Sequence, residues 1–207
     1  MLFDLLDKCR ELNPSSGGVY ATADLSVLLD HQHPSRLAEA IRTLIREGLL
    51  LRVRRGLYVD RLNGYKAEIV GQRWIAPSYL STESALDRHG LCETGIGANT
   101  FVTPHVILRS EHARRRLEGH HFIYRHLARH LFFGYRSVDG LWLAEPEKAV
   151  IDFLYYHYRK QVSAVAPEDI DFSAIDPRRY RRSLAAFRQI GFAEYALGWL
   201  RKRGGHQ

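Results

Sequence analysis

Long apolar runs and paired cysteines are both missing from this sequence of 207 residues. No stretch approaches the roughly 20 apolar residues of a membrane-spanning helix. Charged residues interrupt the apolar N-terminal segment, which favours an amphipathic helix over a signal peptide. The two cysteines, Cys9 and Cys92, lie far apart and fit no metal-binding or redox spacing. We therefore predict a cytoplasmic protein with reduced cysteines and no membrane partner.

The signatures of common enzyme and metal sites are also missing. Gly95 and Gly97 do not belong to a phosphate-binding glycine loop, and no GxSxG sequence surrounds Ser81 or Ser84. Four histidines crowd one region without a cysteine pair or an HExxH pattern: His120, His121, His126 and His130. We therefore predict a protein that is not an enzyme, with no catalytic residue, no metal and no cofactor.

Basic residues, by contrast, are in excess. Lysine and arginine number 30, aspartate and glutamate number 23, and the formal net charge is +7. Such an excess favours nucleic acid or another polyanion as a partner, but it does not indicate a fold. The hydrophobic fraction of 45% is high enough for a buried core, and the length fits one large domain or two small ones.

Residues 20–59 have the order of elements of a winged helix-turn-helix. Thr22 is a suitable N-cap for a first helix, and Pro34 begins a second helix that Gly48 ends. Apolar residues recur at helical spacing in both helices: Leu25, Leu28 and Leu29, then Leu37, Ile41, Leu44 and Ile45. We expect these residues to form the core of the module.

A β-hairpin is predicted directly after the second helix, from residues 49–54 and 57–59 around Arg55 and Gly56. Six arginines and only two glutamates lie between residues 35 and 56. That local excess suits the neutralisation of DNA phosphates, although an ordinary solvated face is the alternative. The predicted DNA-binding residues are Ser35, Arg36, Glu39 and Thr43 at base edges, Arg42 and Arg46 flanking them, and Arg52, Arg54 and Arg55 at phosphates on the wing.

The rest of the chain predicts a second domain at 65–207, joined to a first domain at 1–60 by a polar linker at 61–64. Further helices are expected at residues 1–13, 65–75, 78–91, 145–158, 177–190 and 193–203. The buried face of the helix at 145–158 is expected to hold Val150, Phe153, Leu154 and His157. Strands are expected at residues 99–108, 120–126, 132–138 and 141–143, with 110–118 left open between helix and loop. Pro104 suggests a bulge or an edge position in the first strand, and Asp139 and Gly140 suggest a tight turn between the last two. This order favours an α+β class with a mostly antiparallel sheet in the second domain.

Several motifs, in a fixed order, resemble the AbiEi-type antitoxins of type IV toxin–antitoxin systems. They are RRGLYV, YLSTESALDRHGL, FVTPH, FIYRHL, FFGY and LAEPEKAVIDFLYYH, and together with the winged module they cover residues 22–157. The resemblance implies a transcriptional regulator in phage defence that binds inverted repeats in its own promoter and represses its operon. It further implies that the second domain counteracts a nucleotidyltransferase-like toxin. Direct contact with that toxin and a dimer on DNA are both left open.

Two other functions fit parts of the sequence. Glu145 and Lys148 lie one helical turn apart, and Asp152 lies another turn on. With Glu147 they could serve a metal-dependent nuclease, with the winged module delivering substrate. Alternatively, the chain is an adaptor whose basic C-terminal helix docks an acidic partner or tRNA through Arg178, Arg179, Arg181 and Arg182.

Overall fold

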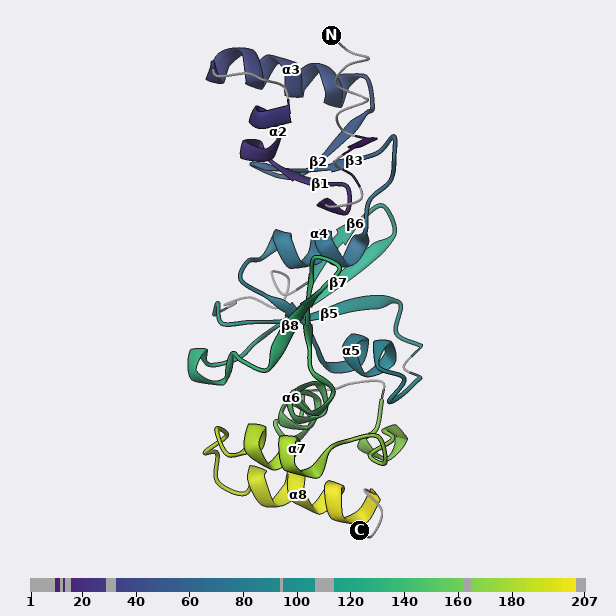
Figure 1. Ribbon diagram of the computed structural model, residues 1–207, viewed down its shortest axis with the longest axis vertical. Helices are drawn as coiled ribbons and strands as arrows, with labels where there is room; N and C mark the ends of the chain where they lie inside the picture. The colour runs from purple at the N-terminus through teal and green to yellow at the C-terminus, as the bar shows by residue number, and fades with distance from the viewer. Residues whose placement is uncertain are drawn as a thin grey trace. The chain divides into compact units, whose positions relative to one another are not determined.

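Both helices and sheets contribute to the two compact units of the protein, Met1–Ala76 and Pro77–Gln207. The computed structural model describes residues 10–11, 13, 16–28, 33–93, 95–106, 114–161 and 165–203 (Figure 1). Most of the helix expected at residues 1–13 lies outside these ranges, as does Cys9. The predicted α+β class is confirmed. Within the described ranges, no helix combines the length and the apolar character needed to cross a membrane.

The N-terminal unit packs its helices on a small antiparallel sheet. Its elements are β1 Val19–Ala21, α2 Thr22–Leu28, α3 Pro34–Arg46, β2 Leu50–Arg54, β3 Leu57–Asp60 and α4 Ala67–Trp74. The strand order is β1-β3-β2, so the expected hairpin of β2 and β3 gains a third strand that the sequence did not predict. Helix α2 begins at Thr22, so Thr22 is the first residue of the helix and not the N-cap before it. Asp24 Oδ2 accepts a hydrogen bond from the Ala21 N–H at 2.8 Å at this end of the helix.

Helix α3 forms where its pattern predicts it. Pro34 occupies the first turn, and Gly48 follows the helix at a φ of +73°, which favours glycine. The apolar face packs into one cluster with residues of β1, α2, β2 and β3: Leu37, Ile41 and Leu44 with Tyr20, Leu25, Leu50 and Tyr58. The opposite face is therefore left to solvent.

Residues 61–64 form a turn within the N-terminal unit, where the sequence suggested a linker. Buried Asp60 accepts hydrogen bonds from the N–H groups of Leu62 and Asn63, at 2.9 and 2.8 Å. Helix α4 then returns to the start of the unit, where Arg73 Nη1 donates to the Val19 carbonyl at 2.9 Å. The compact unit accordingly extends to Ala76, beyond the boundary proposed at residue 60.

The second unit is built on a mixed sheet with strand order β6-β7-β5-β4-β9-β8 (Figure 1). The strands are β4 Tyr79–Leu80, β5 Ala98–Thr103, β6 Arg114–Leu117, β7 His120–His126, β8 Tyr135–Val138 and β9 Leu141–Ala144. Three of the five pairings are antiparallel, while β4–β9 and β5–β7 are parallel. The sheet is thus more mixed than the sequence suggested.

Several strands differ in detail from their predictions. β4 lies inside a segment predicted as helix, and β6 occupies the segment left open between helix and loop. Pro104 neither bulges a strand nor marks an edge, because β5 ends before it and lies inside the sheet. The hairpin of β8 and β9 is confirmed, with Asp139 and Gly140 at φ values of +50° and +83° in its turn.

Helices cover the sheet of the second unit in two layers. They are α5 Thr82–Arg88, α6 Pro146–Tyr158, α7 Pro177–Leu184 and α8 Phe192–Arg203, with 3-10 turns at Arg129–Leu131 and Pro167–Asp169. Helix α6 lies between the sheet and the pair α7–α8 (Figure 1). Residues 147–156 of α6 are therefore buried on all sides, whereas His157, predicted to be buried, is exposed.

Candidate functional site

The exposed face of α3 carries most of the residues predicted to contact DNA. Five of them are exposed: Ser35, Arg36, Glu39, Arg42 and Arg46. Thr43 is half-buried at the edge of this face. Their exposure follows from the amphipathic pattern of α3, since the positions between them hold the apolar residues that the core takes.

The hairpin of β2 and β3 adds the other predicted residues, Arg52, Arg54 and Arg55, all exposed. Its turn is formed by Arg55 and Gly56, with Gly56 at a φ of +79°. The Gly56 carbonyl accepts a hydrogen bond from the Thr22 N–H at 3.2 Å, which ties the hairpin tip to the start of α2. The register of the two strands shifts between Arg52 and Arg54, and such a bulge redirects the side chains that follow it.

Arg54 differs from its neighbours because its guanidinium group is engaged within the unit. Nε donates to the Trp74 carbonyl at 3.2 Å, and Nη2 donates to the Arg73 carbonyl at 3.2 Å. Nη1 donates to the Arg55 carbonyl at 3.0 Å. These carbonyls include the C-terminal end of α4, where a cation is favourable. Arg54 therefore braces the hairpin against α4, a role that the sequence did not indicate.

The remaining guanidinium groups of this face are available to a ligand. Among the described residues, Arg36, Arg42, Arg52 and Arg55 have no acidic partner, whereas Arg46 Nε lies 3.4 Å from Glu47 Oε1 in an exposed pair. An exposed ion pair of this kind contributes little free energy, so Arg46 can readily exchange Glu47 for another anion. The face can therefore bind a polyanion without breaking internal contacts.

The second unit places its most polar contacts in its interior instead. Lys148 and Asp152, one turn apart on α6, form an ion pair with 1% and 0% of their side chains exposed. The hydroxyls of Tyr79 and Ser81 both donate to Asp152 Oδ2, at 2.8 and 2.9 Å. Lys148 Nζ also donates to the Tyr79 hydroxyl oxygen at 3.0 Å. The charges are thus fully enclosed by partners from α6 and from the segment around β4.

Aromatic rings complete the surroundings of Lys148. Its Nζ lies 5.5, 5.2 and 5.3 Å from the ring centres of Tyr79, Phe133 and Phe187. Burial lowers the pKa of the Lys148 ammonium, and the Asp152 carboxylate opposes that change. Burial also raises the pKa of the Tyr79 phenol, and Asp152 raises it further. An i,i+4 pair of opposite charge within an otherwise apolar helix was the sequence signal for this buried site.

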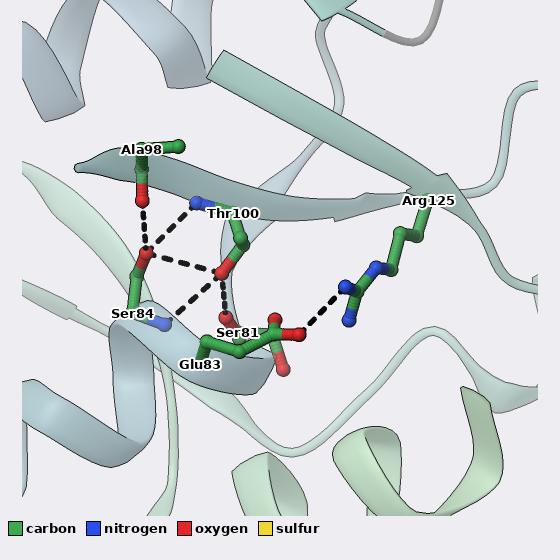
Figure 2. A network of polar contacts seen from close by, with 6 residues as sticks. All are labelled: Ser81, Glu83, Ser84, Ala98, Thr100 and Arg125. Atoms are coloured by element: carbon green, nitrogen blue, oxygen red, sulfur yellow. Dashed lines mark hydrogen bonds and ion pairs between the residues drawn. The ribbon is translucent and has the colours of Figure 1, made fainter. Parts of the chain in front are cut away.

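A neighbouring network joins the start of α5 to β5 and β7 (Figure 2). The Thr100 hydroxyl donates to the Ser81 carbonyl at 2.6 Å and accepts from the Ser84 N–H at 3.0 Å. Beside it, Arg125 Nη2 lies 2.6 Å from Oε1 of fully buried Glu83. Between them, buried Thr82 has a φ of +51°, a strained value for a β-branched residue. The network holds this turn in place.

These contacts bear on the nuclease alternative. Glu147 is buried, and its Oε1 accepts the Asp176 N–H at 3.2 Å, while Lys148 and Asp152 bind each other. The four clustered histidines also separate, because His120, His121 and His126 lie on β7 and His130 lies in a 3-10 turn. Over the described ranges, no group of three His, Cys, Asp or Glu side chains is arranged to hold a metal ion. Glu147, Lys148 and Asp152 are therefore bound by partners inside the fold.

No protein-family model matches the chain, and no curated protein matches it either. The resemblance to AbiEi-type antitoxins consequently depends on the ordered motifs alone. Most of the LAEPEKAVIDFLYYH motif forms the enclosed helix α6, which gives its polar residues a structural task.

Proposed function

We propose that the protein is a DNA-binding antitoxin that represses its own operon and counteracts a nucleotidyltransferase-like toxin. In this proposal the N-terminal unit is a winged helix-turn-helix. Helices α2 and α3 form the helix-turn-helix, α3 enters the major groove, and the hairpin of β2 and β3 is the wing. The protein acts in the cytoplasm, as part of phage defence.

The DNA-binding proposal rests on a row of exposed side chains on α3. Two of them, Arg36 and Arg42, have no acidic partner among the described residues. The 13 residues of α3 extend about 20 Å at 1.5 Å per residue. That length is sufficient to cross a major groove about 12 Å wide. Arg52 and Arg55 lie on the adjacent hairpin, where phosphates flank a groove-bound helix.

Each side chain has a role that its chemistry suits. Arg36 can donate two hydrogen bonds to a guanine edge, and Glu39 can accept one from cytosine. Ser35 and Thr43 can donate hydrogen bonds to either base or accept them, and Arg42 and Arg46 flank these residues. Arg52 and Arg55 bind phosphates, while Arg54 keeps the wing in position. Two copies bound to inverted repeats would form a two-fold symmetric complex.

The test is a titration of fluorescently labelled DNA from the region upstream of the gene, against a scrambled duplex of equal length. Arg36→Ala should weaken binding to the upstream region by about 1–3 kcal/mol and leave binding to the scrambled duplex nearly unchanged. Arg136→Ala, which removes an equally exposed arginine from the second unit, is the matched control. Equal affinity of the native protein for both duplexes would contradict sequence-specific repression.

The antitoxin part of the proposal is supported by the motif resemblance. Co-expression with the neighbouring open reading frame, if that encodes a nucleotidyltransferase, should restore growth that the toxin alone arrests. Arg36→Ala should still restore growth, because the proposed regulatory face and the second unit act separately. Failure of the native chain to restore growth would remove the antitoxin assignment and leave the DNA-binding proposal standing.

A further inference from the structure

The last two helices carry a concentration of charge that the proposed DNA-binding face does not explain. Residues 177–203 contain eight of the 30 basic residues and one of the 23 acidic residues. The segment therefore has a formal charge of +7, equal to that of the whole chain, and the other 180 residues are balanced at 22 of each sign. This segment therefore attracts anions over long range, in addition to the arginine-rich face of the N-terminal unit.

Helix α7 exposes four arginines that internal contacts do not require: Arg178, Arg179, Arg181 and Arg182. Arg178 lies three and four residues before Arg181 and Arg182, and Arg179 lies three before Arg182, so their charges repel one another. Two of them lie in the first turn, where the helix dipole disfavours cations. Within the described ranges, the only side-chain ion pair that these four arginines form is that of Arg179 with Asp176, at 3.8 Å. The arrangement weakens α7, which indicates a purpose other than stability.

The packing of α7 fixes the direction in which these arginines point. Tyr180 and Leu184 are buried, and the Tyr180 hydroxyl donates to the Ala196 carbonyl of α8 at 3.1 Å. The face with the arginines is consequently the one turned to solvent. Helix α8 contributes Arg201 and Lys202, both exposed, to the same pair of helices.

Partly accessible aromatic rings accompany the cations on α8. Tyr195 and Trp199 are half-buried and four residues apart, so they share one face of the helix, and Lys202 Nζ lies 5.9 Å from the Trp199 ring. Exposed His157 of α6 stacks on Tyr195 at 6.3 Å, with Nδ1 2.8 Å from the Tyr195 hydroxyl. Rings beside cations are the features with which proteins bind unpaired nucleotides.

We propose that α7 and α8 form a binding surface for single-stranded RNA. The arginines of α7 neutralise phosphates. Because Phe172 already stacks on Trp199 and His157 on Tyr195, bases stack only on the parts of these two rings that remain accessible. A duplex is a poorer match, because its bases already stack on one another and cannot reach the rings. An acidic protein would satisfy the arginines but give the rings no role. RNA offers unpaired bases in single-stranded segments, loops and ends, where they can stack on aromatic side chains. This proposal does not depend on the DNA-binding function.

The test measures the anisotropy of a labelled 20-nucleotide RNA without secondary structure as the full-length protein is added at several salt concentrations. Each phosphate neutralised contributes about 0.7 to the salt slope of a single strand. Arg181→Ala/Arg182→Ala should lower the slope by about 1.4 and weaken binding about tenfold at low salt. The matched control is Arg129→Ala/Arg136→Ala, which removes two exposed arginines elsewhere in the second unit and should leave the slope unchanged.

A second variant tests the rings. Trp199→Leu should weaken RNA binding about tenfold through lost stacking while the salt slope stays constant. Equal losses in the two arginine double variants would overturn the proposal, because the binding would then reflect net charge alone. Tighter binding of duplex DNA or of polyglutamate at this surface would overturn it as well. Arg181→Ala/Arg182→Ala should leave binding to the upstream DNA intact, so that failure of this proposal and failure of the DNA-binding proposal are distinguishable.

Discussion

The exposed face of α3 in the N-terminal unit and the interior of the second unit contain charged side chains in opposite settings. On the N-terminal unit, Arg36 and Arg42 stand in solvent without an acidic partner in the described ranges. In the second unit, Lys148 and Asp152 are enclosed and bind each other. Exposed charges cost little to keep and remain available for ligands, whereas buried charges persist only when they are paired and hydrogen-bonded. We therefore expect substitutions of Arg36 or Arg42 to affect binding, and substitutions of Lys148 or Asp152 to affect stability.

The largest expected effect comes from breaking the buried pair. Asp152→Ala removes the acceptor of three donors and leaves the Lys148 ammonium without its counter-ion. We expect a loss of about 3–5 kcal/mol in the unfolding free energy of the second unit. Urea unfolding should be followed by tryptophan fluorescence in a Trp74→Phe background, because the remaining tryptophans, Trp142 and Trp199, both lie in this unit.

A double variant separates the pair from its setting. Lys148→Met/Asp152→Leu replaces both charges by apolar side chains of similar size, and it should be less destabilised than Asp152→Ala. If the double variant loses as much unfolding free energy as Lys148→Met and Asp152→Leu lose together, the ion pair does not account for the contribution of Asp152 to stability. Binding to DNA should be unaffected in any variant that remains folded.

The sequence predicted those parts of the fold that depend on residues close together in the chain. The face of α3 with Leu37 and Ile41, and the turn of Asp139 and Gly140, follow from residues next to one another in the chain. The short strands β1, β4 and β6 have only two to four residues each and exist because distant strands pair with them. No periodicity of a few residues can reveal such pairing.

The candidate site was predicted to a similar extent. Exposure of Ser35, Arg36 and Glu39 followed from helical spacing alone. The role of Arg54 could not be predicted, because its partners are carbonyls about twenty residues further along the chain, at the end of α4. His157 was wrongly predicted to be buried for the same reason, because the sequence does not reveal which helices cover α6.

The next largest loss of stability is expected from the hydrogen-bond network shown in Figure 2. Thr100→Val preserves the shape of the side chain but deprives the Ser84 N–H and the Ser81 carbonyl of their buried partner. We expect a loss of about 1–3 kcal/mol in the unfolding free energy of the second unit. Thr100→Ser keeps the hydroxyl and should cost less than Thr100→Val. The reverse order in urea unfolding would show that packing of the methyl group, and not the hydrogen bonds, dominates here.

Alkaline pH should weaken the second unit through its buried tyrosines. Burial raises the pKa of Tyr79 and Tyr156, and Asp152 raises both further. A phenol whose pKa is raised by folding contributes stability that is present below about pH 10 and is lost as the pH rises through the folded value. Lys148 has a lowered pKa and acts in the opposite direction, but only up to its unfolded pKa of about 10.5.

Above pH 10.5 the loss should therefore amount to about 1.4 kcal/mol per pH unit for each such tyrosine. Tyr156→Phe removes one titrating hydroxyl, which donates to the His126 carbonyl at 2.9 Å, and should reduce the slope of stability against pH by that amount. Unfolding midpoints between pH 10.5 and 11.5 measure the slope. An unchanged slope in this variant would mean that Tyr156 ionises to the same extent in the folded and unfolded states, which would contradict a raised pKa in the folded protein.

The smallest effects, and the sharpest contrast, are expected from two arginines only two residues apart on β2. Arg52 has no partner among the described residues, so Arg52→Ala should change stability by less than about 0.5 kcal/mol. It should nevertheless lower the salt slope of DNA binding by about 0.9, the contribution of one phosphate. Arg54→Ala should cost about 1 kcal/mol of stability, because three carbonyls lose a donor in a solvent-exposed setting. Its salt slope should change less than that of Arg52→Ala, since its guanidinium group faces α4. If the two variants exchange these effects, Arg54 contacts phosphate and the bracing role assigned to it is wrong.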